Sequence, residues 1–443
     1  MLMANSPSAQ TRFRAELTPL VKLALPVVLA ELGWMAMGVV DTMMVGNLGA
    51  EAIGAVAMGN VIFNTVGILV IGFLLGLDTL IAQAFGAGDQ ADCDHSLRQG
   101  LWLAALVAPV LLAVMELFAL TLPWWGIDPA VSRLAQPFSA ALAWSVLPLG
   151  VYAVFRRYLQ SMSVVRPVMI ALVSANLINF AGNWLLIEGH WGAPKLGVTG
   201  SAVATIAARI YMAAVLLLAL PRGVLRWEGP DWTRIKTLFL LGVPAAGHIF
   251  LEIAGFGLAT ALAGQFPAFA LAAHEIVLNN AALTYMVPLG ISSAVAVRVG
   301  QAMGRGDRRA AQVAGWTAIA LGAGFMACSG VVMMLAPRQI LGLYTLDPAV
   351  LGVAIPLLGA AAAFQLFDGV QVVATGALRG LGDTKMAFVA NVAGYLVVGL
   401  PVGAVLCFGL HWQVFGLWVG LTLGLMRAAA VLLGAWVRRS SLK

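Results

Sequence analysis

Long apolar stretches separated by short polar segments dominate this sequence. Residues 310–337 form a run of 28 positions without one charged side chain. Over all 443 residues, 61% are hydrophobic and 10% are charged, whereas an ordinary soluble domain has about 25% charged residues. So few charges cannot cover a soluble surface. The composition therefore excludes a cytosolic enzyme, a nucleic-acid-binding protein and a disordered chain, and it indicates a protein that folds in lipid.

Apolar stretches that can cross a bilayer as a helix, which takes about 20 residues, occur twelve times. Lipid offers no partners to backbone groups, and the alternation typical of a membrane barrel is absent, so the spans are predicted to be helices. The expected spans are 20–46, 55–82, 98–122, 135–156, 165–188, 198–220, 237–264, 273–300, 311–336, 350–378, 386–409 and 414–437. We predict an all-α integral membrane protein with twelve transmembrane helices.

Basic residues gather on one side of this predicted topology. That side carries 21 Lys and Arg residues, and the other carries three, Arg133, Lys195 and Arg338. The positive-inside rule therefore places both termini in the cytoplasm. The net charge of +6 is explained by this asymmetry, and no nucleic-acid partner is expected. Residues 1–17 lack the pattern of a cleavable signal peptide, so the first span is expected to direct insertion.

The two halves of the chain repeat each other. Ile81–Asp89 returns as Val299–Asp307, and Pro26 falls on Pro244 at the same offset of 218 residues. Asp128–Val131 returns as Asp347–Val350. We predict a six-helix N-terminal half (1–220), a cytoplasmic linker (221–236) and a six-helix C-terminal half (237–443). Because six is even, the halves have the same orientation, and such parallel repeats usually enclose a cavity and alternate in access.

Three of the carboxylates inside predicted spans are candidates for function, because a charged group there is costly and usually marks an ion pathway. Asp41 lies in the first span, Glu252 near the middle of the seventh and Asp368 near the middle of the tenth. Glu252 and Asp368 are expected at comparable depth. Facing each other, they would hold a proton or bind a hard cation such as Na⁺ through their oxygens. A carboxylate that merely joins two helices is the alternative reading for each.

The repeat supports the functional reading, because its partner positions are not acidic. Ala259 matches Asp41, Trp34 matches Glu252 and Leu149 matches Asp368. Each half has therefore acquired its own carboxylates, as expected of functional groups and not of framework.

Other polar side chains in the spans have open roles. Asn179 and Asn183 share one helix face, and their amides either supply oxygens beside Asp41 or join helices. Thr205 is a weaker candidate of the same kind.

Glu31 and Asp78 lie nearer to helix ends and could be structural. Arg209 is expected to be paired or to lie on a wet surface, and the three scattered cysteines lack the spacing of a metal site.

Several of these segments resemble the multidrug and toxic compound extrusion (MATE) family. Pro26–Ala30 and Val40–Gly46 are similar to its first helix, and Gln83–Gly88 and Gln301–Gly306 to its paired loop motifs. Phe367–Gly380 resembles its tenth helix in the form typical of the NorM-like branch. The similarity covers nearly the whole chain in order.

The resemblance implies an antiporter that exports organic, often cationic or amphipathic, drugs by alternating access, driven by H⁺ or Na⁺. It implies cation coupling by Glu252 and Asp368, which could hold Na⁺, with Asp41, Asn179, Asn183 and Thr205 in an N-terminal network. Some relatives have Tyr where this chain has Phe364, one turn before Asp368, and losing that hydroxyl makes H⁺ more plausible than Na⁺. We expect a monomer in a bacterial-type inner membrane, with no cofactor besides the coupling ion.

Two other classes of protein are less compatible with this sequence. A lipid-linked saccharide flippase shares the plan, but it would carry more basic residues in its cavity, whereas Arg209 is the one arginine expected to be buried. An intramembrane enzyme would need a nucleophile with a base, or a metal cluster; the five histidines are scattered and H-E-x-x-H is absent. We therefore expect the chain not to be an enzyme. A channel is disfavoured by the two-lobed repeat.

Overall fold

The computed structural model describes residues 9–441, and none of these residues forms a strand. The elements of the first half are α1 (Ala9–Gly46), α2 (Ala50–Ile62), η1 (Phe63–Gly67), α3 (Leu69–Phe73), α4 (Gly76–Ala87), α5 (Gln90–Thr121), η2 (Leu122–Trp124), α6 (Pro129–Ala143), α7 (Val146–Ser161), α8 (Arg166–Glu188), η3 (His190–Gly192) and α9 (Val198–Ala219). Those of the second half are α10 (Trp232–Ala263), α11 (Ala268–Gly304), α12 (Arg308–Leu335), α13 (Pro337–Gly342), α14 (Pro348–Gly380), α15 (Lys385–Asn391), η4 (Val392–Gly399), α16 (Leu400–Ala404), η5 (Val405–Gly409) and α17 (Gln413–Ser440).

The predicted class of fold is confirmed, because twelve helical stretches of the described chain are long and apolar enough to cross a membrane. Many of them extend beyond the expected limits: the fourth runs from Pro129 to Ser161. Two of the stretches contain π-helical segments. The second contains a π-helical turn at Phe63–Gly67, and the eleventh contains π-helical segments at Val392–Gly399 and Val405–Gly409. Apolar composition predicts that a segment spans the membrane, but it does not predict where the backbone hydrogen bonds change from the α-helical to the π-helical pattern.

The chain divides into two compact units. We call residues 29–85 and 89–250 the N-terminal unit, and residues 251–441 together with 9–28 and 86–88 the C-terminal unit. Helices α1 and α10 therefore each contribute to both units, and each changes unit shortly after its repeated proline, Pro26 or Pro244. The boundaries proposed from the sequence, 220 and 237, follow the repeat, whereas these units follow packing.

The repeated motifs form the same turns and helix caps in both halves. Gly88 and Gly306 have φ values of 79° and 74°, the left-handed region that suits glycine. The next residue is an aspartate that caps a helix: Asp89 accepts from the Asp92 backbone N–H at 2.9 Å, and Asp307 from that of Ala310 at 2.8 Å. The repeat thus preserves the chemistry that ends one helix and begins the next.

A second pair of caps follows the same rule. Asp128 and Asp347 each accept the backbone N–H two residues further on, at 2.7 and 2.8 Å, and each precedes a proline at the first helical position. Proline suits that position because its missing N–H would have no partner in the helix.

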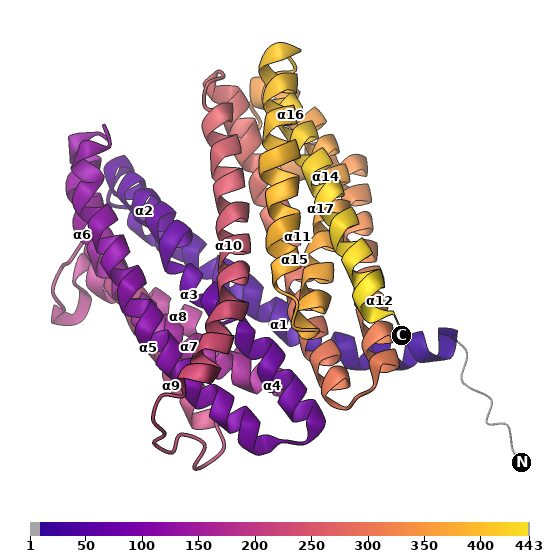
Figure 1. Ribbon diagram of the computed structural model, residues 1–443. Helices are drawn as coiled ribbons and strands as arrows, with labels where there is room; N and C mark the ends of the chain where they lie inside the picture. The colour runs from indigo at the N-terminus through magenta and orange to yellow at the C-terminus, as the bar shows by residue number, and fades with distance from the viewer. Residues whose placement is uncertain (1–8, 442–443) are drawn as a thin grey trace, which may run out of the picture. The chain divides into compact units, whose positions relative to one another are not determined.

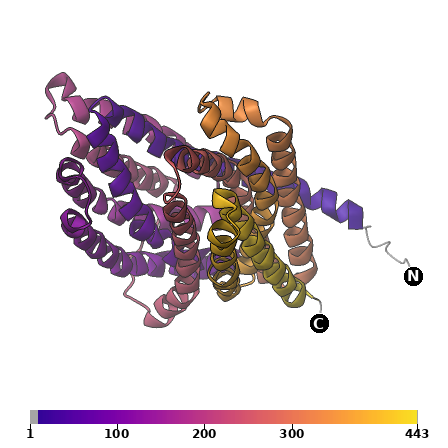
Figure 2. The same cartoon turned by 90° about the horizontal axis from the view of Figure 1, so that it is seen from above.

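In the C-terminal unit, α14 packs against α11, α12 and α17. Figure 1 shows these long helices running side by side in the orange and yellow part of the chain, and Figure 2 shows the same bundle along its helices. Helix α17 also packs closely against η4 and α16 through glycines. A Cβ added at Gly420 would lie 2.3 Å from the Cα of Gly403 and 2.5 Å from the carbonyl oxygen of Gly399.

Gly420→Val is expected to destabilise the protein by about 1–3 kcal/mol, because the new side chain meets backbone that cannot rotate away. The measurement is thermal or denaturant unfolding of the purified protein in detergent. Gly434→Ala on the same helix is the control, since nothing lies within 4 Å of its added Cβ. Equal stability of the two variants would contradict the close packing of α17 on α16.

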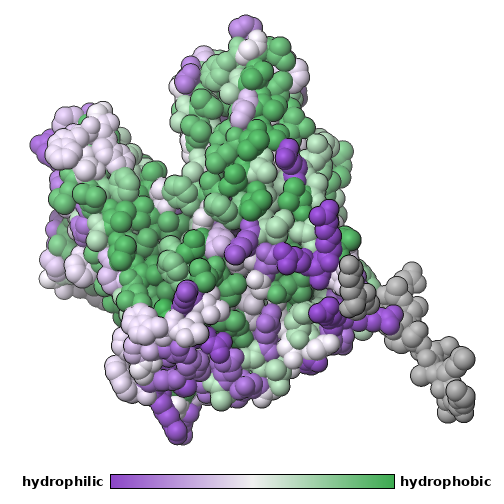
Figure 3. Space-filling view, viewed as in Figure 1, coloured by the Kyte–Doolittle hydropathy of each residue, from purple (hydrophilic) through white to green (hydrophobic). Residues whose placement is uncertain are grey.

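The outer surface of the helices is apolar. Figure 3 shows green hydrophobic residues along much of the visible length of the helices and purple hydrophilic ones gathered toward the lower end. Large apolar side chains face outward here, among them Leu177, Leu218 and Leu335, exposed by 70%, 87% and 79%. An exposed apolar surface of this kind fits a lipid surround. Together with the twelve helices, it makes the chain a multi-pass membrane protein.

The linker between the halves is bound to the N-terminal end of α5. Glu228 accepts from Arg98 and lies 2.7 Å from Nδ1 of His95, and Trp102 donates to the Glu228 carbonyl at 3.0 Å. Asp231 lies 3.1 Å from Nε2 of His95 and caps α10. The segment is therefore attached by side chains to the N-terminal unit.

The attachment of the linker is expected to weaken in acid. Burial acts to raise the pKa of Glu228, but hydrogen bonds from Arg98 and His95 outweigh it and leave the pKa below its ordinary 4.5. The backbone N–H of Arg234, with His95, lowers the pKa of Asp231 below 3.8. Because both folded-state pKa values are lowered, the stabilisation is complete above the ordinary values and is lost as the pH falls through the lowered ones.

Amide hydrogen exchange of residues 221–231, corrected for the intrinsic rate, should therefore show constant protection from about pH 7 to about pH 5 and a loss toward pH 3. Arg98→Gln should weaken that protection already at neutral pH. Loss of protection between about pH 7 and pH 6 in the unaltered protein would contradict the role given to Glu228 and Asp231 in holding the linker, because both carboxyls stay ionised in that range.

Candidate functional site

Glu252 and Asp368 belong to one polar cluster in the C-terminal unit. Glu252 lies on α10 and Asp368 on α14, and the charge of Glu252 acts on the Asp368 carboxyl. Asp368 is 4% exposed, and its Oδ1 has no hydrogen-bond partner among the described residues. A buried carboxylate oxygen without a donor favours uptake of a proton or a cation.

Two tyrosines complete this cluster, and sequence reasoning did not single them out. Tyr285 on α11 hydrogen-bonds with Glu252, and Tyr395 in η4 lies within the field of both carboxylates. The Tyr395 side chain is 1% exposed, and its hydroxyl has no partner in the described part of the chain. A tyrosine in the middle of a span is only a weak indication of a functional site. Because the chain has only six tyrosines, those inside spans are nevertheless candidates.

The Phe364 side chain is part of an aromatic cluster in the C-terminal unit. Its ring centroid lies 5.9 Å from that of Phe256 and 5.4 Å from that of Trp418. Phe256 also lies 5.9 Å from Tyr395. Phe364 lacks a hydroxyl, but Tyr285 brings one to Glu252 from another helix, and the hydroxyl of Tyr395 lies within the field of both carboxylates.

His274 is a structural residue of the same unit. Trp418 Nε1 donates to His274 Nδ1 at 3.1 Å, so Nε2 carries the proton of the neutral ring and donates to Thr260 Oγ1 at 3.0 Å. His274 is fully buried. With both nitrogens engaged, the histidine fastens α11 to α10 and α17.

Asp41 is the centre of a second polar cluster, in the N-terminal unit. Asn183 on α8 donates to Asp41 Oδ1 at 2.7 Å, and Thr205 on α9 lies 3.1 Å from Oδ2. Asn183 also donates to Asn179 Oδ1 at 3.2 Å, and Asn179 donates to Thr205 at 3.4 Å. The structure thus brings together all four residues that the sequence singled out in this half.

The direction of these hydrogen bonds settles how the amides act. The two N–H groups of Asn183 are both used, one on Asp41 and one on Asn179. Thr205 has a single proton, so its hydroxyl donates either to Asp41 or to the Ser201 carbonyl 3.1 Å away. Asn183 therefore presents a donor, and not its oxygen, to Asp41, and a hydrogen bond of this kind favours an ionised carboxylate.

Arg209 lies one turn after Thr205 on α9 and meets neither expectation made for it. It is 5% exposed, and its charge acts on Asp41, but no carboxylate of the described residues lies within ion-pair distance. Its guanidinium instead lies 4.0 Å from the Phe63 ring centroid and 5.4 Å from that of Trp34, and donates to Ser145. Two aromatic faces replace the missing carboxylate.

The expectation that Arg209 is the one buried arginine is wrong. Arg156 and Arg157 are each 5% exposed, and Arg379 is 8% exposed. Arg156 pairs with Glu31, and Arg157 lies 3.1 Å from Asp78 Oδ2. Both arginines lie near the end of a span, where the sequence suggested contact with water. Their carboxylates come from other helices, which only the tertiary structure brings together.

Metal ligation by these carboxylates has limited support. No group of three His, Cys, Asp or Glu side chains within residues 9–441 is placed to hold a metal ion. Na⁺ bound at Glu252 and Asp368 would need further oxygen ligands, and the hydroxyls of Tyr285 and Tyr395 are the candidates in this cluster.

Twelve membrane-crossing helices, a repeated half and buried carboxylates define a polytopic membrane protein with an internal two-fold repeat. The MatE family model matches the chain twice, over residues 26–185 and 244–405. The two matches begin at the positions of Pro26 and Pro244. The chain belongs to the MatE family, the multidrug and toxic compound extrusion family that its motifs resemble.

Relatives match along nearly the whole chain. The probable multidrug resistance protein NorM of Mesorhizobium japonicum is 36% identical, over 98% of this chain and 97% of that protein. The multidrug resistance protein PmpM of Pseudomonas aeruginosa is 36% identical, over 97% of this chain and 93% of that protein.

Solved structures share the fold at lower identity. The eukaryotic MATE transporter AtDTX14 superposes with a TM-score of 0.88 at 23% identity, over 97% of this chain and 98% of that one. A MATE structure in a bent conformation gives 0.88 at 18% identity, over 98% of both chains.

Proposed function

We propose that this protein exports organic cations and amphipathic drugs in exchange for H⁺ or Na⁺. The observation that carries the proposal is the Asp368 carboxyl, buried beside Glu252 with one oxygen that lacks a donor. Support comes from family membership and from relatives named multidrug resistance proteins. The bilayer of a bacterial-type inner membrane, with both termini in the cytoplasm, is the proposed setting, and a monomer is the proposed functional form.

In the proposed cycle, the coupling ion neutralises Glu252 and Asp368. Tyr285 orients Glu252, and Tyr395 offers a hydroxyl that is free to turn toward whichever species is bound. Loading can drive export only if the ion binds the inward-open and outward-open states with different affinity. Asp41 serves as a second ionisable group, whose charge the donors of Asn183 and Thr205 stabilise.

The lipid-linked saccharide flippase remains the less supported alternative. Two of the additional buried arginines, Arg156 and Arg157, do not favour it, because Glu31 and Asp78 engage them. A pyrophosphate group would have to displace these carboxylates.

Ethidium efflux from proteoliposomes that contain only this protein tests the proposal. A pH gradient and a Na⁺ gradient are imposed separately, with empty liposomes as the control. Efflux driven by the pH gradient alone identifies H⁺, and efflux driven by Na⁺ at constant pH identifies Na⁺. Absence of efflux under both gradients, for ethidium and for a panel of cationic drugs, would refute the proposed export.

A further inference from the structure

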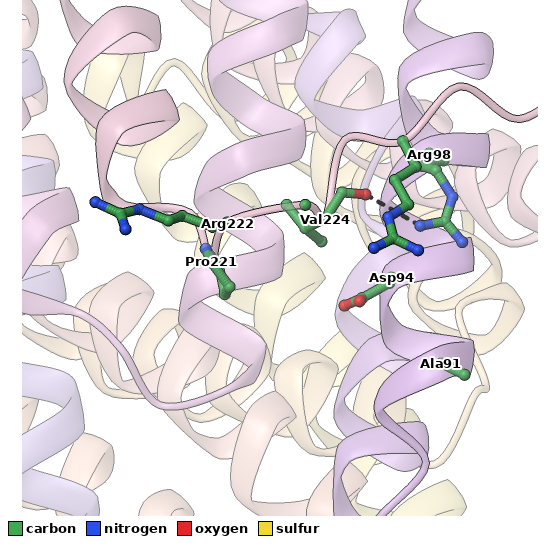
Figure 4. A pocket seen from close by; sticks show the side chains of 8 residues that line it. Ala91, Asp94, Arg98, Pro221, Arg222 and Val224 are labelled. Atoms are coloured by element: carbon green, nitrogen blue, oxygen red, sulfur yellow. Dashed lines mark hydrogen bonds between the residues drawn. The ribbon is translucent and has the colours of Figure 1, made fainter.

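A pocket of about 350 Å³ lies in the N-terminal unit, between the start of α5 and the linker. Its lining comes from α5 (Ala91, Asp94, Arg98) and from the linker (Pro221, Arg222, Gly223, Val224, Arg226). Figure 4 shows Arg98 bound to the Val224 carbonyl, Asp94 directed toward the space beside it, and Arg222 extending outward from the linker. None of these residues belongs to the proposed transport machinery.

The pocket has positive charge without a carboxylate partner. Arg98 is paired with Glu228 and donates to the Val224 carbonyl at 3.0 Å. Arg222 and Arg226 are exposed, and within the described part of the chain neither forms an ion pair. Both arginines belong to the lining of the pocket, and exposed guanidinium groups on one short segment suit an anion with several acceptor oxygens.

The single acid of the pocket is already engaged. Asp94 Oδ1 accepts from Tyr158 at 2.6 Å and from Gln90 at 2.7 Å. Asp94 is thus held by donors from α5 and α7, and the lining contains two arginines without an ion-pair partner against this one acid.

Exposed apolar and aromatic side chains flank the lining residues of the linker in the sequence. Leu217 and Leu218, at the end of α9 just before the linker, are exposed by 45% and 87%. Trp227 and Trp232, on the other side of Arg226, are exposed by 87% and 64%. Exposed tryptophans beside an apolar helix end are typical of the level where a bilayer meets water. A soluble anion would make no contact with these apolar side chains, whereas the acyl chains of a phospholipid would pack against them.

We propose that this pocket binds the phosphate of an anionic phospholipid, with Arg222 and Arg226 on the phosphate oxygens and the acyl chains against Leu217 and Leu218. Basic pockets at the cytoplasmic end of membrane helices recognise anionic headgroups in this way. Binding there would hold the linker, and with it the start of α10, at the membrane surface. The site does not depend on the proposed transport.

The test compares two double variants of the full chain. Arg222→Gln with Arg226→Gln removes the two unpaired charges of the pocket. Arg305→Gln with Arg308→Gln removes two exposed arginines from the same predicted side of the membrane but outside the pocket. Each purified protein is mixed with phosphatidylglycerol or phosphatidylcholine, and the retained lipid is counted by native mass spectrometry, with and without inorganic phosphate. Thermal unfolding in lipid-free detergent verifies that both variants fold.

The unaltered protein is expected to retain phosphatidylglycerol in preference to phosphatidylcholine. The pocket variant should lose affinity roughly fivefold per arginine, and the control variant should stay within about twofold. An equal loss of phosphatidylglycerol binding in the two variants would show that general surface charge causes the effect, and it would overturn the proposal. Equal retention of both lipids would overturn it too, and complete displacement by millimolar phosphate would make the ligand a free phosphate and not a lipid.

Discussion

Asp368→Asn is expected to reduce gradient-driven drug efflux by about ten- to hundredfold while the protein still folds and inserts. The amide keeps the shape of the carboxyl but cannot take up a proton or carry a charge for a cation. An ion gradient can drive export only through an ion that binds two conformations of the protein with different affinity, and the amide removes that binding. Glu252→Gln should have a similar effect, because both carboxyls act in one cluster.

The measurement is ethidium efflux from proteoliposomes at matched protein content, with the growth of cells on drug-containing plates as a second readout. Glu275→Gln, on α11 in the same unit, is the control and should leave efflux unchanged. Full efflux and full resistance in both Asp368→Asn and Glu252→Gln would refute the coupling role, and the coupling site would then have to be sought at Asp41.

The second large effect is expected at the buried pair of Asp78 and Arg157, exposed by 1% and 6% at their side chains. Asp78→Leu should destabilise the protein by about 3–5 kcal/mol, because it leaves a buried guanidinium without its carboxylate. Arg157→Met should cost less, since an orphaned carboxyl can take up a proton whereas a guanidinium cannot give one up.

The double variant, Asp78→Leu with Arg157→Met, should recover most of the stability, because an apolar pair of similar volume has no charge to desolvate. Denaturant unfolding in detergent, analysed as a double-mutant cycle, measures the coupling. Additive losses in the double variant would show that the two side chains do not depend on each other, contrary to the 3.1 Å contact between Arg157 Nη1 and Asp78 Oδ2.

The Asp41 cluster shows how far the sequence leads toward a site. The i, i+4 spacing predicts that Asn179 and Asn183 share a face, because helical geometry is local. Which way each amide turns depends on Asp41 and Thr205 from other helices. Only the tertiary structure shows that Asn183 turns its donor toward the carboxylate while Asn179 donates to Thr205.

The Glu252 and Asp368 cluster shows the corresponding limit. Depth along each span can be read from the sequence, since a helix rises by a fixed length per residue. The rotation of one helix about its axis relative to its neighbours cannot be read so directly. The sequence therefore does not predict that Tyr285 hydrogen-bonds with Glu252 or that Tyr395 lies within the field of both carboxylates.

The sequence by itself determined that this chain spans a membrane twelve times, that its halves repeat and that carboxylates lie within the spans. These properties depend on composition, on length and on matches between segments, which need no knowledge of contacts. The tertiary structure decided which buried charges are paired, Arg156 and Arg157 with acids and Arg209 with aromatic rings. The physical reason is that the cost of a buried charge depends on the partners that distant helices bring to it.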